Sequence, residues 1–288
     1  RRAIQKEPSD LARKIMWVIF AETIRKTSNA RTSTYKLHIR PLEDLATLPD
    51  PLQVFRHELL EAVGRFRYHE ELLKSKGLLN HGRYCAKTEL RCQDIRADIV
   101  ADSKTSFDLM ITSPPYGDNR STVSYGQFSY LALNWIPNHD LPDVPRLFSN
   151  AYVTDASSLG GSMIDAENKA SVICSISREF SGYYNALKKM RGRGLEAKVA
   201  SFVYDFYEAL NIIVSRIKSG GYLAWTLGDR TVGGISVPFV GICRELQESL
   251  GLSHVVSVRR KIPSKRAPSR NSVSETIGSE CLLLMRRP

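Results

Sequence analysis

The feature that most constrains the fold of this chain is an alternation of strand-like and helix-like segments that begins near Tyr84. The apolar runs 107–112 and 222–227 predict buried strands, and a well-marked helical pattern lies between them. Its apolar positions recur at steps of four and three: Val199, Val203, Phe206, Leu210, Ile213 and Ile217. We expect Ser219-Gly220-Gly221 to end this helix. Strands separated by helices of this length predict βαβ units and a largely parallel sheet.

Three further segments complete the predicted sheet. Residues 88–92 read as a strand that ends at Gln93-Asp94, and Pro238 opens another amphipathic helix. The last two strand-like segments, 254–258 and 280–285, have no helix between them, so we expect them to pair antiparallel. The predicted fold class is therefore α/β, mainly parallel with an antiparallel closing strand.

The first 83 residues follow a different, mainly helical pattern. A helix is predicted after Pro8-Ser9-Asp10, with its buried face at Leu11, Ile15, Val18 and Ile19. Asp50 is a predicted cap for a second helix whose buried stripe is Leu52, Phe55, Leu59, Val63 and Phe66. Residues 34–40 alternate like a short strand. We therefore predict a helical segment at 1–83, a second domain at 84–288 and an insertion in that domain at 137–198.

Composition limits the classes of partner. With 42% hydrophobic residues the chain can form a core, and a net charge of +11 favours polyanions. The five cysteines form no CxxC pair and show no metal-ligand spacing with the histidines, so we predict free thiols, a reducing cytoplasm and no metal site. The longest apolar run, 15–21, is shorter than the roughly 20 residues that span a bilayer, so no membrane partner is expected.

A stiff corner follows the predicted strand 107–112, with the sequence Ser113-Pro114-Pro115-Tyr116. Ligands of open α/β sheets bind beyond the carboxyl ends of the strands, which is where this corner lies. Proline fixes φ and removes its own N–H, so the pair holds neighbouring carbonyls in a defined direction without a competing donor. A hydroxyl, rigid acceptors and an aromatic face suit a planar base that carries an amino group. The alternative is an ordinary surface turn.

This tetrapeptide after Phe-Asp-Leu-Met-Ile-Thr resembles the catalytic motif of amino-group DNA methyltransferases. Its Ser form is typical of enzymes that methylate N4 of cytosine, whereas Asp or Asn is typical of adenine-N6 enzymes. The resemblance covers 84–288 apart from the insertion. It implies a Rossmann-like methyltransferase sheet, S-adenosylmethionine as cofactor and double-stranded DNA with a flipped target base as partner. The implied catalytic residues are Ser113, Pro114, Pro115 and Tyr116, and a cognate restriction endonuclease is a possible partner.

The same resemblance makes Asp94 the expected acid that touches the adenosyl part of the cofactor, although it can equally cap a turn. Lys218 to Tyr222 resembles the turn into the fifth strand of the family. The Phe-x-Gly-x-Gly cofactor loop of the family is absent, and Leu159-Gly160-Gly161 and Gly233-Gly234 are poor substitutes. Because the sequence begins at Arg1 without Met, we expect the loop upstream, with a partner chain as the alternative.

Basic residues are candidates for contacts with DNA phosphates. One set is predicted to lie in a loop between the last two strands: Arg259, Arg260, Lys261, Lys265, Arg266 and Arg270. Phosphate binding and a solvated loop are equally compatible with it. A second set with the same ambiguity is Arg25, Lys26, Arg31, Lys36 and Arg40. Within the predicted insertion, Tyr183 and Tyr184 beside basic residues favour recognition of the DNA target.

Two other functions remain open at this level. A related methyltransferase could act on adenine N6 or on RNA, although Ser113 argues against adenine. A non-catalytic DNA-binding component that lacks the cofactor loop is the other alternative. No motif predicts the DNA target sequence or the oligomeric state.

Overall fold

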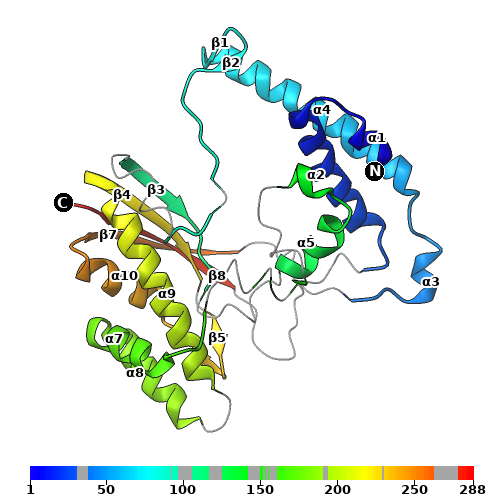
Figure 1. Ribbon diagram of the computed structural model, residues 1–288. Helices are drawn as coiled ribbons and strands as arrows, with labels where there is room; N and C mark the ends of the chain where they lie inside the picture. The colour runs from blue at the N-terminus through cyan, green and yellow to red at the C-terminus, as the bar shows by residue number, and fades with distance from the viewer. Residues whose placement is uncertain are drawn as a thin grey trace. The chain divides into compact units, whose positions relative to one another are not determined.

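The computed structural model describes residues 1–30, 38–91, 93–96, 106–116, 125–141, 150, 151, 153, 155, 161–190, 194–228, 230–262 and 278–288. The chain forms two compact units (Figure 1). The first combines residues 1–92 with 124–154, and the second combines 93–123 with 155–288. The division therefore falls at 92/93 rather than at the predicted 83/84, and part of the predicted insertion belongs to the first unit.

The first unit is mainly helical. Its described elements are α1 Arg2–Gln5, α2 Asp10–Thr27, α3 Leu42–Leu45, α4 Pro51–Ser75, β1 Leu79–Asn80, β2 Arg83–Tyr84, α5 Tyr125–Leu133 and the 3₁₀ helix η1 Asn138–Asp140. Helix α2 packs against α4 and α5.

The predicted starts of α2 and α4 are confirmed. The Ser9 hydroxyl accepts from the Ala12 N–H at 3.2 Å, and the Asp50 carboxylate accepts from the Leu52 N–H at 3.0 Å. Pro51 occupies the first position of α4, where its missing N–H costs nothing.

The predicted buried faces of these helices are largely wrong. On α2, Ile19 is buried as predicted, but Leu11 and Val18 are exposed, and the other buried side chains are Trp17 and Thr23. On α4 the residues Leu52, Val63 and Phe66 are exposed, and Ala62 is its buried residue. The face of α2 that is buried is the one that carries Trp17, which contacts the distant residue Asp140.

The sequence predicts two strands in the N-terminal half, at 34–40 and 88–92. Residues 88–91 form no strand, which corrects that prediction, and Cys92 lies outside the described residues. Most of the predicted strand 34–40 also lies outside them, and Ile39 forms a single antiparallel bridge with Ala30.

The second unit contains a four-stranded mixed sheet with the order β3-β4-β8-β7 (Figure 1). Its strands are β3 Phe107–Thr112, β4 Ile217–Leu227, β7 Ser253–Lys261 and β8 Ser279–Arg286. Strands β3 and β4 are parallel, and β8 is antiparallel to both β4 and β7. The predicted parallel neighbours and the antiparallel closing pair are thus confirmed, whereas the described sheet is smaller and more mixed than predicted.

The predicted helix at 199–217 ends earlier than expected. Helix α9 spans Leu195–Ser215, and Ile217 is the first residue of β4. The Arg287 guanidinium donates to the Val214 carbonyl at 2.9 Å and also to the Ile217 carbonyl, which satisfies the helix end there.

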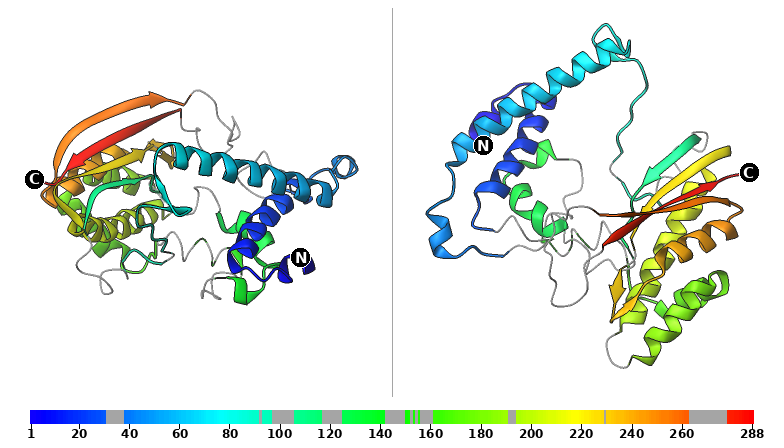
Figure 2. Two further views of the ribbon diagram at one scale, coloured as in Figure 1. Left: turned by 90° about the horizontal axis from the view of Figure 1, so that it is seen from above. Right: turned by 180° about the vertical axis from the view of Figure 1, so that it is seen from behind.

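Helices cover one face of this sheet. Helices α7 Ala166–Ile176, α8 Arg178–Lys189, α9 and α10 Phe239–Ser249 all lie on the same side (Figure 2). Helices α9 and α10 contact the strands, and α7 and α8 pack against α9. The core includes Ile173, Phe180 and Leu187 from the predicted insertion, so that part of the insertion is structural.

Among the described residues, the structure contains no helix with the length and apolar character needed to cross a membrane. Cys243 and Cys281 are buried and form no disulfide, whereas Cys85 is exposed. Burial raises the pKa of Cys243.

Candidate active site at the carboxyl end of strand β3

The Ser113-Pro114-Pro115-Tyr116 corner follows the last residue of β3. In the parallel pairing of β3 with β4, Thr112 lies opposite Trp225, and β4 ends at Leu227. The carboxyl ends of the two strands are therefore neighbours at one edge of the sheet, as predicted. Asp229, which follows β4 in the sequence, lies outside the described residues.

The hydroxyl groups of the corner contact each other. Ser113 Oγ and Tyr116 Oη lie 2.9 Å apart, and either oxygen can be the donor. Ser113 is exposed, whereas Pro114, Pro115 and Tyr116 are half-buried. Because the two prolines have no N–H, the carbonyls of this stretch meet fewer local donors and can accept from a ligand. The corner therefore combines an accessible hydroxyl pair, carbonyl acceptors and an aromatic ring.

The strand beside the corner is held by a buried polar contact. The indole N–H of Trp225 donates to Gln247 Oε1 of α10 at 2.8 Å, and the Gln247 amide donates to the Cys243 carbonyl at 3.1 Å. The ring of Phe206 meets the Trp225 ring edge-on at 5.4 Å between centroids. These contacts hold the carboxyl end of β4 in place beside the Ser113-to-Tyr116 corner, and a ligand-binding site needs such rigid support. Trp225 and Gln247 carry no recognisable sequence motif, so sequence reasoning missed them.

The predicted cofactor acid, Asp94, does not lie at the end of a described strand. Its carboxylate accepts from the Arg96 guanidinium at 2.9 Å and from the Arg96 backbone N–H at 2.9 Å. These hydrogen bonds from the Arg96 side chain and backbone lower the pKa of Asp94. The contact with the N–H two residues later is an Asx-turn, the alternative role that the sequence left open.

Arg96 also approaches acidic side chains of α9. Its Nη1 lies 3.4 Å from a carboxylate oxygen of Glu208 and 3.9 Å from one of Asp205. Arg96 therefore fastens the segment that contains Asp94 to α9. The sequence signal that could have identified this contact is the short spacing between Asp94 and Arg96. The side chain of an Arg two residues after an Asp can fold back and donate to the carboxylate.

The alternative glycine pairs have structural roles in the described residues. Gly233 and Gly234 have φ of 61° and 83° and form the two-residue turn between β5 Thr231–Val232 and β6 Ile235–Ser236. Positive φ at both positions is the requirement of a type I′ hairpin turn. Gly161 donates its N–H to Asp205 at 2.5 Å, and Gly160 lies outside the described residues.

Of the six basic residues predicted between the last two strands, three lie in a strand and three lie outside the described residues. Arg259, Arg260 and Lys261 belong to β7, because its pairing with β8 continues to Lys261 opposite Ser279. The prediction that these three lie in a loop is therefore wrong. Arg260 pairs with Glu280 across the strands at 2.8 Å. Lys265, Arg266 and Arg270 lie outside the described residues.

The two tyrosines assigned to target recognition are buried. Tyr183 and Tyr184 belong to the core, and the Tyr184 ring stacks on Phe180 at 5.6 Å between centroids. Their rings therefore stabilise α8 against its neighbours. Contact between this segment and DNA would require its exposed basic side chains.

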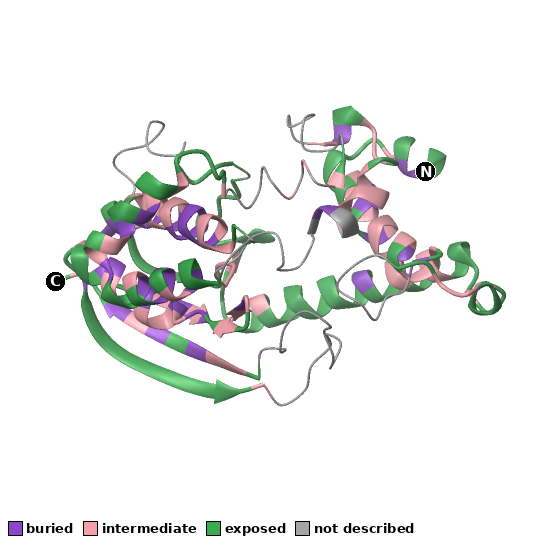
Figure 3. Cartoon of the chain, turned by 90° about the horizontal axis from the view of Figure 1, so that it is seen from below, coloured by how far each residue is buried: buried purple, intermediate pink, exposed green. Residues whose placement is uncertain are grey.

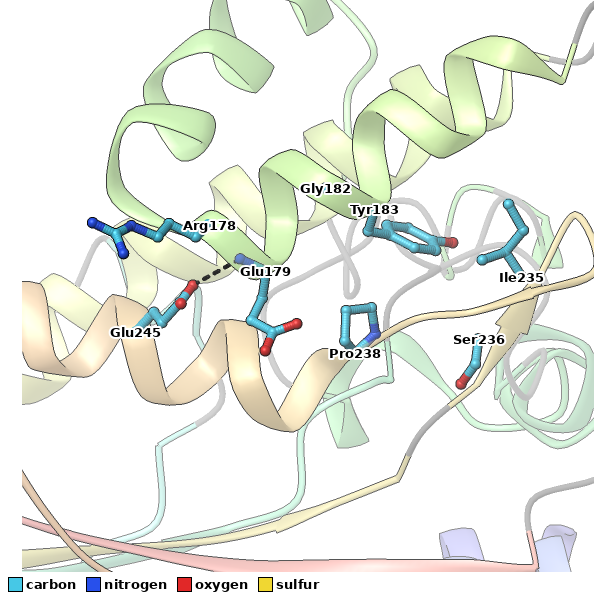
Figure 4. Close-up of a pocket in the computed structure, with 8 residues that line it drawn as sticks. All are labelled: Arg178, Glu179, Gly182, Tyr183, Ile235, Ser236, Pro238 and Glu245. Carbon is cyan, nitrogen blue, oxygen red and sulfur yellow. Dashed lines mark hydrogen bonds between the residues drawn. The ribbon is translucent and has the colours of Figure 1, made fainter.

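A separate pocket of about 560 Å³ lies between α8, α10 and β6 (Figure 4). Its lining includes Arg178, Glu179, Tyr183 and Glu245 and none of the residues of the corner. The Glu245 carboxylate accepts from the Ser177 hydroxyl at 2.6 Å and from the Glu179 N–H at 3.1 Å. Glu245 thus caps the beginning of α8, which is a structural role.

Comparison with known proteins supports one relationship. No protein-family model matches the chain. A solved structure of a Thermus thermophilus protein described as a DNA modification methylase aligns with a TM-score of 0.33 and 13% identity, over 68% of this chain and 50% of that one. The Type II methyltransferase M.MvaI of Kocuria varians is 29% identical over 276 residues, which is 92% of this chain and 56% of the relative. The chain thus spans about half the length of the curated relative that it matches. Along nearly all of its own length, this chain is similar in sequence to a Type II methyltransferase.

Proposed function

We propose that this chain provides the base-binding part of an S-adenosylmethionine-dependent DNA methyltransferase that modifies N4 of cytosine. The observation that carries the proposal is the Ser113-to-Tyr116 corner at the carboxyl end of a parallel strand, with its two hydroxyl oxygens 2.9 Å apart. The similarity to a Type II methyltransferase supports the enzyme class.

The chemistry of the target explains the residue types. The exocyclic amine of cytosine is a poor nucleophile because its lone pair is delocalised into the ring. Acceptors that hold the amino hydrogens localise the lone pair on nitrogen and point it at the methyl donor. In the proposal, Ser113 and the carbonyls of the Pro114-Pro115 stretch are these acceptors, and the Tyr116 ring stacks on the base. An amine inside a duplex is not accessible in line, so the base must be flipped out.

The contact between the two hydroxyl groups sets the direction of Ser113. A serine hydroxyl rotates freely unless a partner fixes it. When Ser113 donates to Tyr116 Oη, its lone pairs remain available to an amino group. Tyr116 then has two tasks, because its ring stacks on the base while its hydroxyl orients Ser113.

The described residues provide only part of a cofactor site. Asp94 is engaged by Arg96, and the sequence contains no Phe-x-Gly-x-Gly loop. When bound, S-adenosylmethionine supplies an electrophilic methyl group. The part of this chain in the reaction is to hold the base, to restrict water at the amine and to accept the amino hydrogens.

Further parts of the proposal concern DNA and partners. Arg259, Arg260, Lys261, Lys265, Arg266 and Arg270 are proposed to contact phosphates, which supply most non-specific affinity. Asp94 remains a candidate for the adenosyl group if Arg96 moves to its other acceptors, Glu208 and Asp205. A cognate restriction endonuclease is a further proposed partner, because the relative is a Type II methyltransferase.

Analysis of methylated nucleosides tests the assignment. The gene in its full length is expressed in bacteria that contain no N4-methylcytosine, beside a Ser113→Ala control, and the digested DNA is examined by mass spectrometry. We expect N4-methylcytosine with the unaltered gene and far less with the control. N6-methyladenine in place of N4-methylcytosine would overturn the cytosine assignment, and equal N4-methylcytosine in both samples would remove Ser113 from the site.

A further inference from the structure

In the first unit, the second half of α4 and the hairpin after it lie outside the core. Ala62, near the middle of α4, is the buried residue of this helix. Every residue from 63 to 85 is exposed except Leu73 and Leu79, which are half-buried (Figure 3). We call residues 63–85 the arm, and it consists of the end of α4 and the strands β1 and β2 (Figure 1). The arm therefore presents a surface that packing within the unit does not use.

The backbone joins the hairpin firmly to the end of α4. Gly77 has a φ of 65° and donates its N–H to the Lys74 carbonyl at 3.0 Å. The next N–H, of Leu78, donates to the Leu73 carbonyl at 2.9 Å. These two bonds form the Schellman motif, which ends a helix and sets the direction of the residues after it. The helix end and the hairpin therefore keep a fixed relation to each other.

Both elements of the arm have shapes that enter the major groove of DNA. Strand β1 pairs with β2 through a turn at His81 and Gly82, whose φ values of 47° and 74° are typical of a type I′ turn. Residues 63–75 of α4 extend about 20 Å along the helix axis. The major groove is about 12 Å wide and admits an α-helix or a two-stranded ribbon. The shape of the arm is therefore compatible with a duplex.

The charge of the arm favours a polyanion as its partner. The basic residues outnumber the acidic residues: Arg65, Arg67, Lys74, Lys76 and Arg83 against Glu70 and Glu71. Glu70 is already paired with Lys74 of the same helix at 2.6 Å. Surfaces that bind phosphates need exposed cations, whereas lysine is depleted from protein–protein interfaces. The arm is therefore better suited to DNA than to another protein.

One side of α4 in the arm contains no acidic residue. Helix positions three, four and seven apart share a side, so residues at these steps after Arg65 lie together with it. We call this set, together with the basic residue at the helix end, the acid-free face: Arg65, Tyr68, His69, Leu72 and Lys76. Glu70 and Glu71 lie on other sides of the helix, because successive residues are about 100° apart. The side chain of Tyr68 is 70% exposed, so its ring and hydroxyl are accessible.

We propose that the arm binds duplex DNA through the acid-free face of α4 and the tip of the hairpin. This inference rests on the proposed function for the identity of the partner, and it assigns a contact outside the Ser113-to-Tyr116 corner and outside β7. Arg65 and Lys76 would donate to phosphates, and Tyr68 and His69 would reach base edges in the groove. The buried tyrosines of α8 cannot supply such contacts, whereas the side chains of the arm are exposed.

A second copy of this chain is the alternative occupant. Phe66 is 56% and Val63 is 39% exposed, and both lie outside the acid-free face. Two arms packed through these residues would bring two positively charged surfaces together, which opposes association. A duplex is attracted by the same charge. The charge of the arm therefore favours DNA over self-association.

A matched pair of arginine variants tests which side of α4 contacts DNA. Arg65 and Arg67 are both exposed, and two positions along a helix place them on opposite sides. Binding of each variant chain to a fluorescently labelled duplex of mixed sequence is measured by anisotropy at several salt concentrations. Arg65→Ala should weaken binding about tenfold and lower the slope of log affinity against log salt by about 0.9. Arg67→Ala should weaken binding less than about twofold, because salt screens a charge on the opposite side. Both variants should keep the Tm of the unaltered chain, since both side chains are exposed.

Labelling of a native cysteine tests the hairpin. Cys85 is exposed and follows β2 directly, so iodoacetamide is expected to modify it without any substitution. The control is a Leu42→Cys chain, because Leu42 is 84% exposed on α3 of the same unit. The modified peptides are quantified by mass spectrometry. With duplex at ten times its dissociation constant, labelling of Cys85 should slow about tenfold, and labelling at 42 should not change.

Three results would overturn the proposal while leaving the proposed function intact. Equal losses for Arg65→Ala and Arg67→Ala would show that net charge alone acts. Unchanged labelling of Cys85 in the presence of duplex would exclude the hairpin from the contact. Protection of Cys85 that grows with the concentration of the chain, without duplex, would identify a second copy as the occupant.

Two further results separate this inference from the proposed function. A chain that binds no duplex at any salt concentration would overturn both. Binding requires no methylation, so the expected loss for Arg65→Ala together with N6-methyladenine as the product would support the arm and reject the proposed base specificity alone.

Discussion

Ser113 Oγ and Tyr116 Oη lie 2.9 Å apart, so the first and last residues of the Pro-Pro corner contact each other across it. This contact links the group that we assign to the amino hydrogens with the ring that we assign to stacking. It also means that a change at Tyr116 has two separable effects. Substitutions that remove the ring and the hydroxyl in turn can measure them.

Tyr116→Ala is expected to reduce both binding and turnover in the complete enzyme. Stacking of a base on an aromatic ring is worth about 1–3 kcal/mol, and the ring also positions the amine for attack. Tyr116→Phe keeps the ring and loses the hydroxyl contact with Ser113, worth about 0.5–1.5 kcal/mol, so it should retain more activity than Tyr116→Ala. Single-turnover methylation compares the two variants. Equal and complete loss in both would make the hydroxyl the essential group, and full activity in both would reduce the corner to a turn.

Ser113→Ala is expected to cause a large but incomplete loss of methylation, because the carbonyls of the corner remain as acceptors. The substitution should leave the Tm unchanged, since the Ser113 side chain is exposed. Pro114→Ala should also reduce the rate, through looser placement of those carbonyls. The rate of methyl transfer and the Tm are measured on the same samples. A fall in Tm that parallels the fall in rate would indicate unfolding in place of a catalytic defect.

The sequence predicted the parts of the fold that depend on local patterns. The caps at Ser9 and Asp50, the strand β3 and the antiparallel pair β7/β8 all follow from nearby residues. The position of the corner at a strand end followed from β3 alone, and its adjacency to the end of β4 followed from the α/β alternation.

Two of the incorrect predictions concern contacts between residues far apart in the sequence. The buried face of α2 is set by Trp17 and Asp140, which are 123 positions apart, and α9 ends where Arg287 reaches it. The strand predicted at 88–92 rested on local sequence alone, without a neighbouring strand that required it. The Asp94 carboxylate accepts a hydrogen bond from Arg96, two residues later, and its role toward the cofactor stays a prediction. Local periodicity does not determine such partners.

Gly221→Ala should destabilise the second unit. A Cβ at this position would lie 2.7 Å from Ile217 Cγ2 and 3.0 Å from the Asp108 carbonyl oxygen, so β3 and β4 would have to separate. Overpacking of this kind typically costs about 1–3 kcal/mol. Gly182→Ala is the control, because nothing lies within 4 Å of its Cβ and alanine favours helix α8. Urea unfolding should show a loss of stability for Gly221→Ala and none for Gly182→Ala.

Asp140→Ala should strongly destabilise the first unit. The buried Asp140 carboxylate accepts from Arg13 Nε at 2.8 Å and from the Trp17 indole N–H at 2.7 Å. Removal of one partner of a buried pair leaves the other without compensation, which costs about 3 kcal/mol. Glu70→Ala is the control, because it removes an exposed ion pair with Lys74 at 2.6 Å, and exposed pairs contribute little to stability. If Asp140→Ala and the control lowered the free energy of unfolding in urea equally, the Asp140 contacts would contribute no more than an exposed ion pair.

The contacts of Asp140 with Trp17 and Arg13 also predict how the stability of the fold depends on pH. Burial would raise the pKa of Asp140, but the hydrogen bonds from Trp17 and Arg13 lower it overall below the usual 3.8. A group with a lowered pKa stabilises the fold above its unfolded pKa and loses that contribution as the pH falls through the folded value. The stability difference between the unaltered chain and Asp140→Asn should therefore be larger at pH 7 than at about pH 3. A difference that grows in acid would contradict this assignment.

The last prediction concerns the binding of DNA by β7. Each ion pair with a phosphate that a substitution removes should lower the slope of log affinity against log salt by about 0.9. Lys261→Ala removes one charge from the end of β7, so we expect the slope to fall by about that amount, with affinity lowered equally for unrelated sequences. Lys14→Ala makes the same change of charge at a residue outside the proposed DNA-binding set and should leave the slope unaltered. Fluorescence anisotropy with a labelled duplex at several salt concentrations gives both values. An equal fall in the two variants would show that net charge alone acts, and that the basic residues of β7 have no specific position on the DNA.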